Sequence, residues 1–236
     1  KGLRKIRNQA RQIRRMAECQ RAQRRLEKRR WIGASTRNLC DRLFASAQGH
    51  GNGSQIPWSA ATEAKRLVKQ GYRCLKIKVA RGVGAAGAAL DADRVEAIRE
   101  AVGPDVTLRC DANRGWSLND ALTFGLRVTD LNLQYVEEPV RDVENDLAAF
   151  HCTTGVPVAL DESVDEVFAK CFSKSDKQTS ISVADALEEL FEPTFGVVAL
   201  VLKPSLIGGF EACSLAAAAA RTKGVNAVVT TAFESG

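Results

Sequence analysis

The sequence predicts an α/β fold whose parallel sheet is either closed into a barrel or doubly wound, and three observations lead to this prediction. Across residues 58–236, six helix-like segments each lead into a short apolar segment. Helices that alternate with strands imply parallel pairing through right-handed crossovers. The 236 residues are 45% apolar and 26% charged, which is enough for a buried core. No run of residues reaches the about 18 apolar positions that a membrane span needs.

Residues 1–46 are predicted to form a basic helical arm, because Arg, Gln, Ala and Leu are good helix formers. Residues 1–30 carry thirteen Lys or Arg against Glu18 and Glu27, a balance of +11. The whole chain carries +6, so the rest carries −5, the difference between the two values. Binding to nucleic acid or another anionic partner is therefore confined to the arm. Residues 1–30 contain no aromatic residue for base stacking, so we expect a solvated arm and no nucleic-acid partner.

A Gly-rich polar stretch at residues 47–57, AQGHGNGSQIP, indicates a linker, and the barrel-like part is expected over residues 58–236. Its helices are expected at residues 59–70, 90–101, 118–128, 142–152, 185–190 and 210–223. The strands that follow these helices, in the same order, are CLKIKV, VTLRCD, LQYVEE, VPVALDE, GVVALVLK and NAVVTT. A polar insertion around residues 170–182 separates the fourth and fifth units.

Nearly every predicted strand ends in a charged residue that a buried strand should not tolerate. These residues are Lys76, Lys78, Asp111, Glu137, Asp161 and Lys203. Because side chains alternate along a strand, the charged ends share one inward face, and Arg109 lies on the same face as Asp111. Each motif alone is typical of a solvated strand edge or a turn. Together, three carboxylates and three amines would be costly inside a sheet unless a divalent cation and a substrate used them.

The chemistry of this charged set favours a hard cation. Three carboxylates with no Cys or His among them predict a Mg²⁺ site ahead of a Ca²⁺ or Zn²⁺ site. A divalent cation beside lysines suggests carbon-acid chemistry, in which a proton next to a carboxylate is removed.

The sequence resembles the enolase superfamily in five motifs, which are LKIKV, RCDAN, VEEP, LDES and VLKPS. The similarity is to the branch with a lysine on both the second and the sixth barrel strands. The segments LQYVEEPV, GVPVALDES, KPSLIGGFE and VVTTAFESG are similar, more narrowly, to o-succinylbenzoate synthases, in the form that multifunctional plant and algal proteins carry. The resemblance covers about residues 58–236. It implies a TIM-type (β/α) barrel that is truncated to about six βα units.

The resemblance also implies roles for the charged residues. Asp111, Glu137 and Asp161 would be the Mg²⁺ ligands, Lys78 the base and Lys203 its partner across the substrate ring. In the family reaction, a cyclohexadiene carboxylate loses its alpha proton and then water by syn elimination, which leaves an aromatic ring. The resemblance further implies a small-molecule carboxylate substrate, other modules of a multifunctional fusion as partners, a role in menaquinone or phylloquinone biosynthesis, and a soluble chloroplast protein.

Further residues have supporting roles in this interpretation. Lys76, Arg109 and Thr230 are expected to face the substrate. Four residues, namely Asn113, Glu138, Glu162 and Glu234, are expected to hydrogen-bond the ligands instead of binding the metal themselves.

Several alternatives remain open at the level of sequence. The same lysine pair serves N-acylamino-acid racemases, dipeptide epimerases and muconate cycloisomerases. A non-catalytic fragment with an anion-binding basic arm is the alternative from a different class. The family's N-terminal capping domain, first strand and last strand have no convincing counterpart in the sequence, so weak activity or none is expected from the polypeptide alone.

Overall fold

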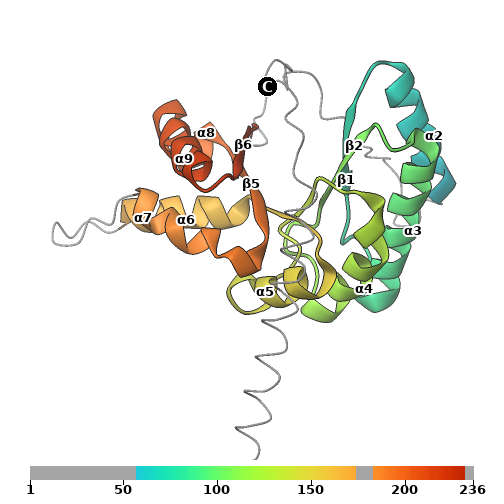
Figure 1. Cartoon of the computed structure of the whole chain (residues 1–236), viewed down its shortest axis with the longest axis horizontal. Coiled ribbons are helices and arrows are strands. Elements are labelled where there is room, and N and C mark those ends of the chain that lie inside the picture. Colours follow the sequence, from blue (N-terminus) through green and yellow to red (C-terminus); the bar gives the residue numbers. More distant parts are fainter. Residues whose placement is uncertain (1–56, 174–182, 232–236) are drawn as a thin grey trace, which may run out of the picture.

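The computed structural model describes residues 57–173 and 183–231, and these form one parallel sheet with helices outside it (Figure 1). Six strands follow the sheet in chain order: β1 (Cys74–Lys78), β2 (Thr107–Asp111), β3 (Tyr135–Glu137), β4 (Val158–Leu160), β5 (Val197–Leu202) and β6 (Asn226–Val229). Every neighbouring pair is parallel. The predicted fold class is therefore confirmed, as an open row of six βα units in the manner of a truncated TIM-type barrel.

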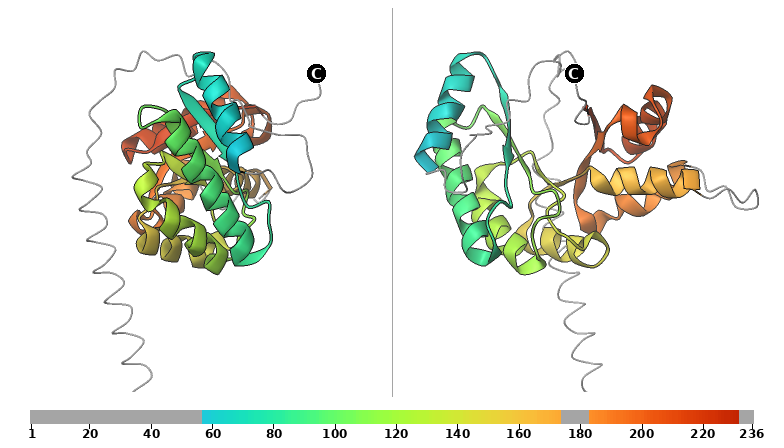
Figure 2. Two further views of the ribbon diagram at one scale, coloured as in Figure 1. Left: turned by 90° about the vertical axis from the view of Figure 1, so that its right-hand side faces the viewer. Right: turned by 180° about the vertical axis from the view of Figure 1, so that it is seen from behind.

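Helix α2 precedes β1, the other helices connect successive strands, and the helices lie on the outer side of the curved sheet in all three views (Figures 1 and 2). They are α2 (Pro57–Lys69), α3 (Gly84–Val102), α4 (Leu118–Val128), α5 (Val143–Thr154), α6 (Glu162–Ser173), α7 (Val183–Glu188), α8 (Pro204–Ile207) and α9 (Phe210–Thr222). Three short 3-10 helices complete the connections: η1 (Thr129–Leu131), η2 (Glu189–Phe191) and η3 (Pro193–Phe195).

The alternation of side chains divides the apolar residues between two clusters. Leu75, Ile77 and Val79 belong to the large core between the sheet and the helices. A small second cluster contains Tyr135, Ala159, Ala199 and Val201 and faces the opposite, concave side. The expected face of charged strand ends is this concave side, because each charged residue alternates with a residue of the outer core.

Cross-strand register brings the ends of the first strands level with one another. Lys78 is the register partner of Asp111, and Asp111 is the register partner of Glu137. Glu137 in turn pairs with Ala159, so Asp161 lies beyond the end of β4. Parallel pairing therefore delivers groups from distant parts of the sequence to one rim.

Two helices differ from the sequence prediction. The sequence predicts no helix between the fourth strand and the polar insertion expected around residues 170–182, but helix α6 fills this segment, and its Val164 and Phe168 are fully buried one turn apart. Helix α3 begins at Gly84, six residues before the expected start, although glycine is a poor helix former. A Cβ atom on Gly82 would lie 2.8 Å from the Cα of Gly87, so glycine is required where the preceding loop touches this helix.

Some predicted features lie outside the described residues. These are the basic arm, the linker as far as residue 56, the insertion from residue 174 to 182, and Glu234. Pro57, the last residue of the expected linker, is the first residue of α2. Among the helices that the structure describes, none is long and apolar enough to cross a membrane.

Candidate active site

Three charged side chains from β1 and β2 meet at the rim on the concave face. The Nζ atom of Lys76 lies 3.0 Å from Oδ2 of Asp111 and 2.8 Å from Oε1 of Glu137. The Nζ atom of Lys78 lies 3.2 Å from the same Asp111 oxygen. The structure thus brings together four of the residues singled out in the sequence, and Lys76 bridges two of the three acids.

The other half of the charged set meets where β4 and β5 end. Lys203 places Nζ 2.6 Å from Oδ1 of Asp161 and 3.7 Å from Oδ2 of Asp165. Lys203 follows directly after β5 and precedes the short helix α8, which Pro204 begins. Asp161 stands between β4 and α6, and its backbone carbonyl accepts hydrogen bonds from Val164 and Asp165 in the first turn of that helix.

Glu137 is a strongly perturbed carboxyl group of the site. Only 1% of the residue is exposed, and its Oε2 atom is buried without a hydrogen-bond partner. Burial raises the pKa of Glu137 to about 8, with the negative charges of Asp111 and Asp161 acting in the same direction and Lys76 opposing them. A buried carboxylate next to two further carboxylates is a position where added positive charge is strongly favourable.

The lysines respond in the opposite way. Burial lowers the pKa of Lys76, but the neighbouring charges of Glu137 and Asp111 outweigh burial and raise the pKa overall. Burial likewise opposes the charged form of Lys203, and Asp161 more than compensates, so that its pKa is also raised. Both ammonium groups are therefore held protonated by the acids beside them.

The donor set of the rim fits a magnesium ion better than a softer metal. Among the described residues, no three acidic, His or Cys side chains are gathered closely enough to form a metal-binding group, and the ammonium of Lys76 lies between Asp111 and Glu137. The unpartnered Oε2 of Glu137 nevertheless marks a buried oxygen that a cation would satisfy. Asp111, Glu137 and Asp161 offer only carboxylate oxygens, which are the ligands of hard cations.

A hydrogen-bond network behind the rim is organised around Glu138. This residue is fully buried, and its carboxylate accepts bonds from the backbone amides of Asp161 at 3.0 Å and Ser163 at 2.8 Å. Its other oxygen accepts from Ser163 Oγ at 3.1 Å and from Arg114 Nε at 3.0 Å. Burial raises the pKa of Glu138, while Arg114 and Ser163 oppose that shift. Glu138 therefore touches the backbone of a candidate ligand, and its supporting role toward a metal stays a prediction.

Asn113 and Glu162 form the second contact of this network. The side-chain amide of Asn113 donates to Oε1 of Glu162 at 2.7 Å, and its backbone amide donates to Oδ1 of Asp111 at 3.1 Å. Asn113, Arg114 and Glu138 all have positive φ angles, between 41° and 56°, at the ends of β2 and β3. Non-glycine residues rarely adopt this conformation, and clusters of such residues are typical of functional sites.

Arg109 and Thr230 lie at the edges of the site. Arg109 donates from Nε to Oε1 of Gln134 at 2.5 Å, and its guanidinium lies 5.1 Å from the centre of the Tyr135 ring. It sits two residues before Asp111 on the same face, one layer deeper in the sheet. Thr230 follows β6 and donates its backbone amide to the carbonyl of Leu202 at 2.9 Å. Contact of either residue with substrate stays a prediction.

The sequence interpretation did not single out Arg114, whose guanidinium donates hydrogen bonds to three different residues. It pairs with Glu138 and also donates to Ser163 and Glu166 on α6. The only signal in the sequence is its place three residues after Asp111, because its partners are 24 to 52 residues away.

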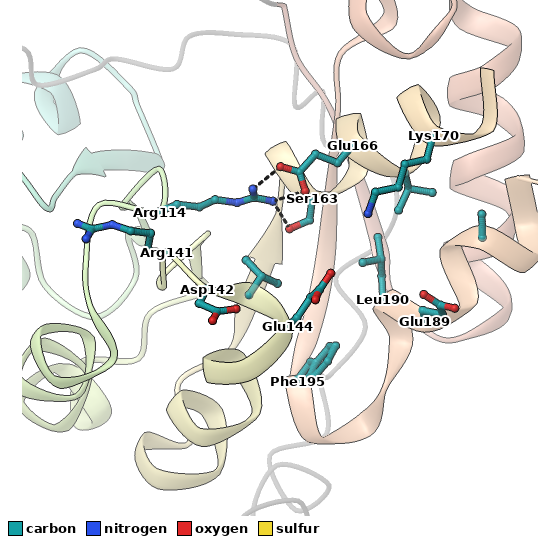
Figure 3. A pocket seen from close by; sticks show the side chains of 13 residues that line it. Arg114, Arg141, Asp142, Glu144, Ser163, Glu166, Lys170, Glu189, Leu190 and Phe195 are labelled. Atoms are coloured by element: carbon teal, nitrogen blue, oxygen red, sulfur yellow. Dashed lines mark hydrogen bonds and ion pairs between the residues drawn. The ribbon is translucent and has the colours of Figure 1, made fainter. Parts of the chain in front are cut away.

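A cavity of about 480 Å³ lies on the helix side of the sheet and not in the concave face (Figure 3). Residues of α5, α6, α7 and the 3-10 helices line it, with charges of both signs and the apolar Leu190 and Phe195. Arg114 and Ser163 are shared between this cavity and the network behind the rim. The converging acids and lysines, and not this cavity, mark the candidate active site.

Comparisons with known proteins agree with this geometry. Residues 59–170 match the model of the enolase C-terminal domain-like family. The chain is 41% identical over 180 residues to the protein PHYLLO, chloroplastic, of Arabidopsis thaliana, covering 76% of this chain and 9% of that protein. It is 32% identical over 169 residues to the o-succinylbenzoate synthase of Photorhabdus laumondii, covering 70% of this chain and 44% of that enzyme.

A solved structure supports the same relationship. The dipeptide epimerase of Cytophaga hutchinsonii, complexed with Mg and the dipeptide D-Ala-L-Val, superposes with a TM-score of 0.60 at 27% identity. The match covers 78% of this chain and 44% of that one, so the chain spans less than half the length of these relatives. From the matched family segment, the parallel row of βα units and these relatives, the chain belongs to the enolase superfamily.

Proposed function

We propose that this chain carries the catalytic groups of an o-succinylbenzoate synthase, a magnesium-dependent lyase that expels water from a cyclohexadiene carboxylate. The observation that carries the proposal is the row of lysines and acids from five successive strand ends on one concave face. The similarity to PHYLLO over 76% of the chain and to a bacterial o-succinylbenzoate synthase supports this reaction within the superfamily.

Each residue has a different role in the proposed reaction, according to its position in the site. Asp111, Glu137 and Asp161 would hold Mg²⁺, which when bound supplies positive charge where the substrate carboxylate becomes a dianion. Lys78 removes the proton alpha to that carboxylate, for which it must first lose its own proton. Lys203, whose ammonium is stabilised by Asp161, stays charged beside the ring and stabilises the delocalised anion.

The second half of the reaction needs no further group. Once Lys78 carries the proton from carbon, its Nζ can deliver that proton to the departing hydroxyl on the same side of the ring. Water leaves, the ring becomes aromatic, and the lysine is neutral again. The elimination is syn because one side chain acts in both steps.

Long incubations with the cyclohexadiene carboxylate and Mg²⁺, followed by the absorbance of the aromatic product, test this proposal. We expect slow product formation that a chelator stops and that Lys78→Ala and Lys203→Ala each abolish. Lys65→Ala, on the surface of α2, serves as the control for loss of a lysine. Product formation that persists in both site variants would contradict the proposal.

Dipeptide epimerisation is the second candidate, because the Cytophaga epimerase shares the fold of the described residues. Two lysines, Lys78 and Lys203, stand at the ends of different strands, as a two-base exchange of a proton requires. Incubation of Ala-containing dipeptides in heavy water separates the candidates. Solvent deuterium at the alpha carbon, without any aromatic product from the cyclohexadiene carboxylate, would favour the epimerase.

For the setting of the reaction, we propose the chloroplast and quinone biosynthesis, since the Arabidopsis relative is named as a chloroplastic protein. The small share of that relative that the chain covers supports partnership with other modules of a larger protein. Import of a fluorescent fusion into isolated chloroplasts, compared with a fusion to an unrelated cytosolic protein, tests the compartment.

A further inference from the structure

Arg114 occupies a constrained position between β2 and α4. Its φ angle of 56° lies in the left-handed region, and its backbone amide donates to the carbonyl of Glu138 at 2.9 Å. The side chain is 21% exposed and leads away from the concave face toward α6. The backbone thus fixes the starting point of the guanidinium before any side-chain contact is made.

The guanidinium bridges the end of β3 and helix α6, which follows β4. Its Nε donates to Glu138 at 3.0 Å at the end of β3, while Nη2 donates to Ser163 Oγ at 2.8 Å on α6. Both terminal nitrogens also bond the carboxylate of Glu166, at 2.5 and 3.1 Å, in the fork geometry that arginine favours (Figure 3). The loop after β2 is therefore tied to the helix after β4 across the end of β3.

Glu138 transmits this bridge to a candidate metal ligand. It accepts the backbone amides of Asp161 and Ser163 on one oxygen, and Arg114 pairs with its other oxygen. A fully buried carboxylate that lost this cation would be left with neutral donors alone, which is costly and would favour a rearranged side chain. The position of the Asp161 backbone, and so the direction of its carboxylate, depends on Glu138 staying in place.

We propose that Arg114 is a positioning residue for the magnesium ligands, which acts by holding Glu138 so that Glu138 fixes the backbone of Asp161. The proposal rests on the proposed function in one respect, namely that Asp161 is a metal ligand. Arg114 itself touches neither metal nor substrate. Its influence on the site passes through two consecutive hydrogen-bonded steps.

Two variants of the full chain test the proposal, one without the bridging guanidinium and one with only its contact to Glu166 weakened. Arg114→Gln removes the cation from Glu138, whereas Glu166→Gln weakens only the contact of Arg114 with the exposed side of α6. Arg127→Gln is the matched control, because Arg127 also pairs with two acids, Asp93 and Glu96, on the outer helices. Amide hydrogen exchange of Asp161 and Ser163 is measured by NMR in all variants, with Thr107 at the opposite end of the sheet as the internal reference.

In Arg114→Gln we expect exchange at Asp161 and Ser163 to accelerate at least about tenfold, with little change at Thr107. Calorimetry should show Mg²⁺ binding weakened by about 10- to 100-fold, the range typical of residues that orient metal ligands. Glu166→Gln and Arg127→Gln should change both measurements by less than about threefold. Uniform acceleration at all three amides would indicate a merely structural role and overturn the proposal, as would unchanged exchange.

The two measurements also separate this proposal from the proposed function. If the wild-type chain bound no Mg²⁺, the proposed function would fail, yet exchange at Asp161 and Ser163 would still decide whether Arg114 holds Glu138. If wild-type binding were normal and Arg114→Gln bound Mg²⁺ equally well, the positioning role would fail and the proposed function would stand.

Discussion

Lys76 stands between Asp111 and Glu137 at the distance of an ion pair from both carboxylates. Its charge reduces the repulsion between two acids that the register of β2 and β3 places side by side. An ammonium group satisfies one oxygen on each acid, yet Glu137 keeps a second, buried oxygen without a hydrogen-bond partner. This oxygen is where a divalent cation would add an electrostatic interaction that Lys76 does not supply, which is the argument for a cation at this site.

Replacement of Asp161 by Asn tests whether the acids act as one cation site. Asp161→Asn keeps the shape of the side chain but removes one of three carboxylate charges, so Mg²⁺ affinity should fall at least about tenfold. Calorimetric titration of wild type and variant measures the change, with Asp93→Asn, a surface partner of Arg127, as the control. Equal heats of Mg²⁺ binding for wild type and Asp161→Asn would contradict the hypothesis that the three acids form one cation site.

The raised pKa of Glu137 makes a prediction about stability without metal. The folded chain holds the Glu137 proton up to about pH 8, whereas the unfolded chain releases it near pH 4.5. Between these values the folded state binds more protons, so the free energy of unfolding from this group falls as pH rises, by at most about 1.4 kcal/mol per pH unit. Urea unfolding in chelator at pH 5.5, 6.5 and 7.5 should show a steeper decline for wild type than for Glu137→Gln.

Other groups also titrate in that interval, among them Asp165, whose pKa burial raises to about 6. Their contributions are common to both proteins, so the difference between the two curves isolates Glu137. Parallel curves for wild type and Glu137→Gln would mean that this carboxyl group is already ionised in the folded chain at neutral pH.

Single elements show where the sequence was informative and where it was not. The strands were predictable, because short β-branched runs after each helix pattern alternate apolar and charged side chains, as in CLKIK of β1. Helix α6 was missed although Val164 and Phe168 give it a helical apolar spacing, since the polar residues that follow led us to expect an insertion. The first turns of α3 were missed because Gly84 and Gly87 are poor helix formers, and tertiary packing overrode that preference.

The residues of the candidate site also divide into those that the sequence predicted and those that it did not. The acids and lysines could be predicted because each follows a recognisable strand and the period of two fixes its face. Their partners could not, since the contacts of Arg114 with Glu138 and Glu166 join loops that only folding brings together. Nothing local in the sequence distinguishes this arginine from a solvated one, such as Arg73 beside β1.

The start of β5 provides a test at the level of one element. Gly196 has a φ angle of 62°, and a Cβ atom there would overlap the ring of the buried His151. The Nδ1 of that ring donates to the carbonyl of Val156 at 2.9 Å, so it cannot move aside without losing a bond. Gly196→Ala should therefore cost about 3 kcal/mol or more of unfolding free energy, from overlap and left-handed backbone together.

Gly155→Ala is the matched control, because Gly155 has a similar φ angle of 67° but open space at the Cβ position. Only the unfavourable left-handed backbone conformation of alanine applies there, and we expect the free energy of unfolding to fall by about 1 kcal/mol. Urea denaturation of both variants measures the difference. Equal destabilisation of the two would show that His151 yields to the added methyl group and that packing at this junction is loose.

At the scale of the whole molecule, the described strands form an open row and not a closed ring. Within residues 57–173 and 183–231, β1 pairs only with β2 and β6 only with β5. Val229 on β6 is 55% exposed, although the strands in the middle of the row are buried. The acids and lysines of the candidate site nevertheless all come from the ends of β1 to β5, so the row carries them on one side without enclosing them.

This combination predicts slow turnover by the chain alone. Proton abstraction from a carbon acid depends on a precisely held substrate and on the exclusion of water, and both are weakened where one side of the site is an unpaired strand. With cyclohexadiene carboxylate and Mg²⁺, we expect kcat/KM at least about 100-fold below that of the Photorhabdus synthase assayed in parallel, which is the loss that a misplacement of about 1 Å can cause. Lys78→Ala provides the blank. A chain that matched the bacterial enzyme would show that six strands enclose the substrate well enough, and that the exposed edge at β6 has no part in the chemistry.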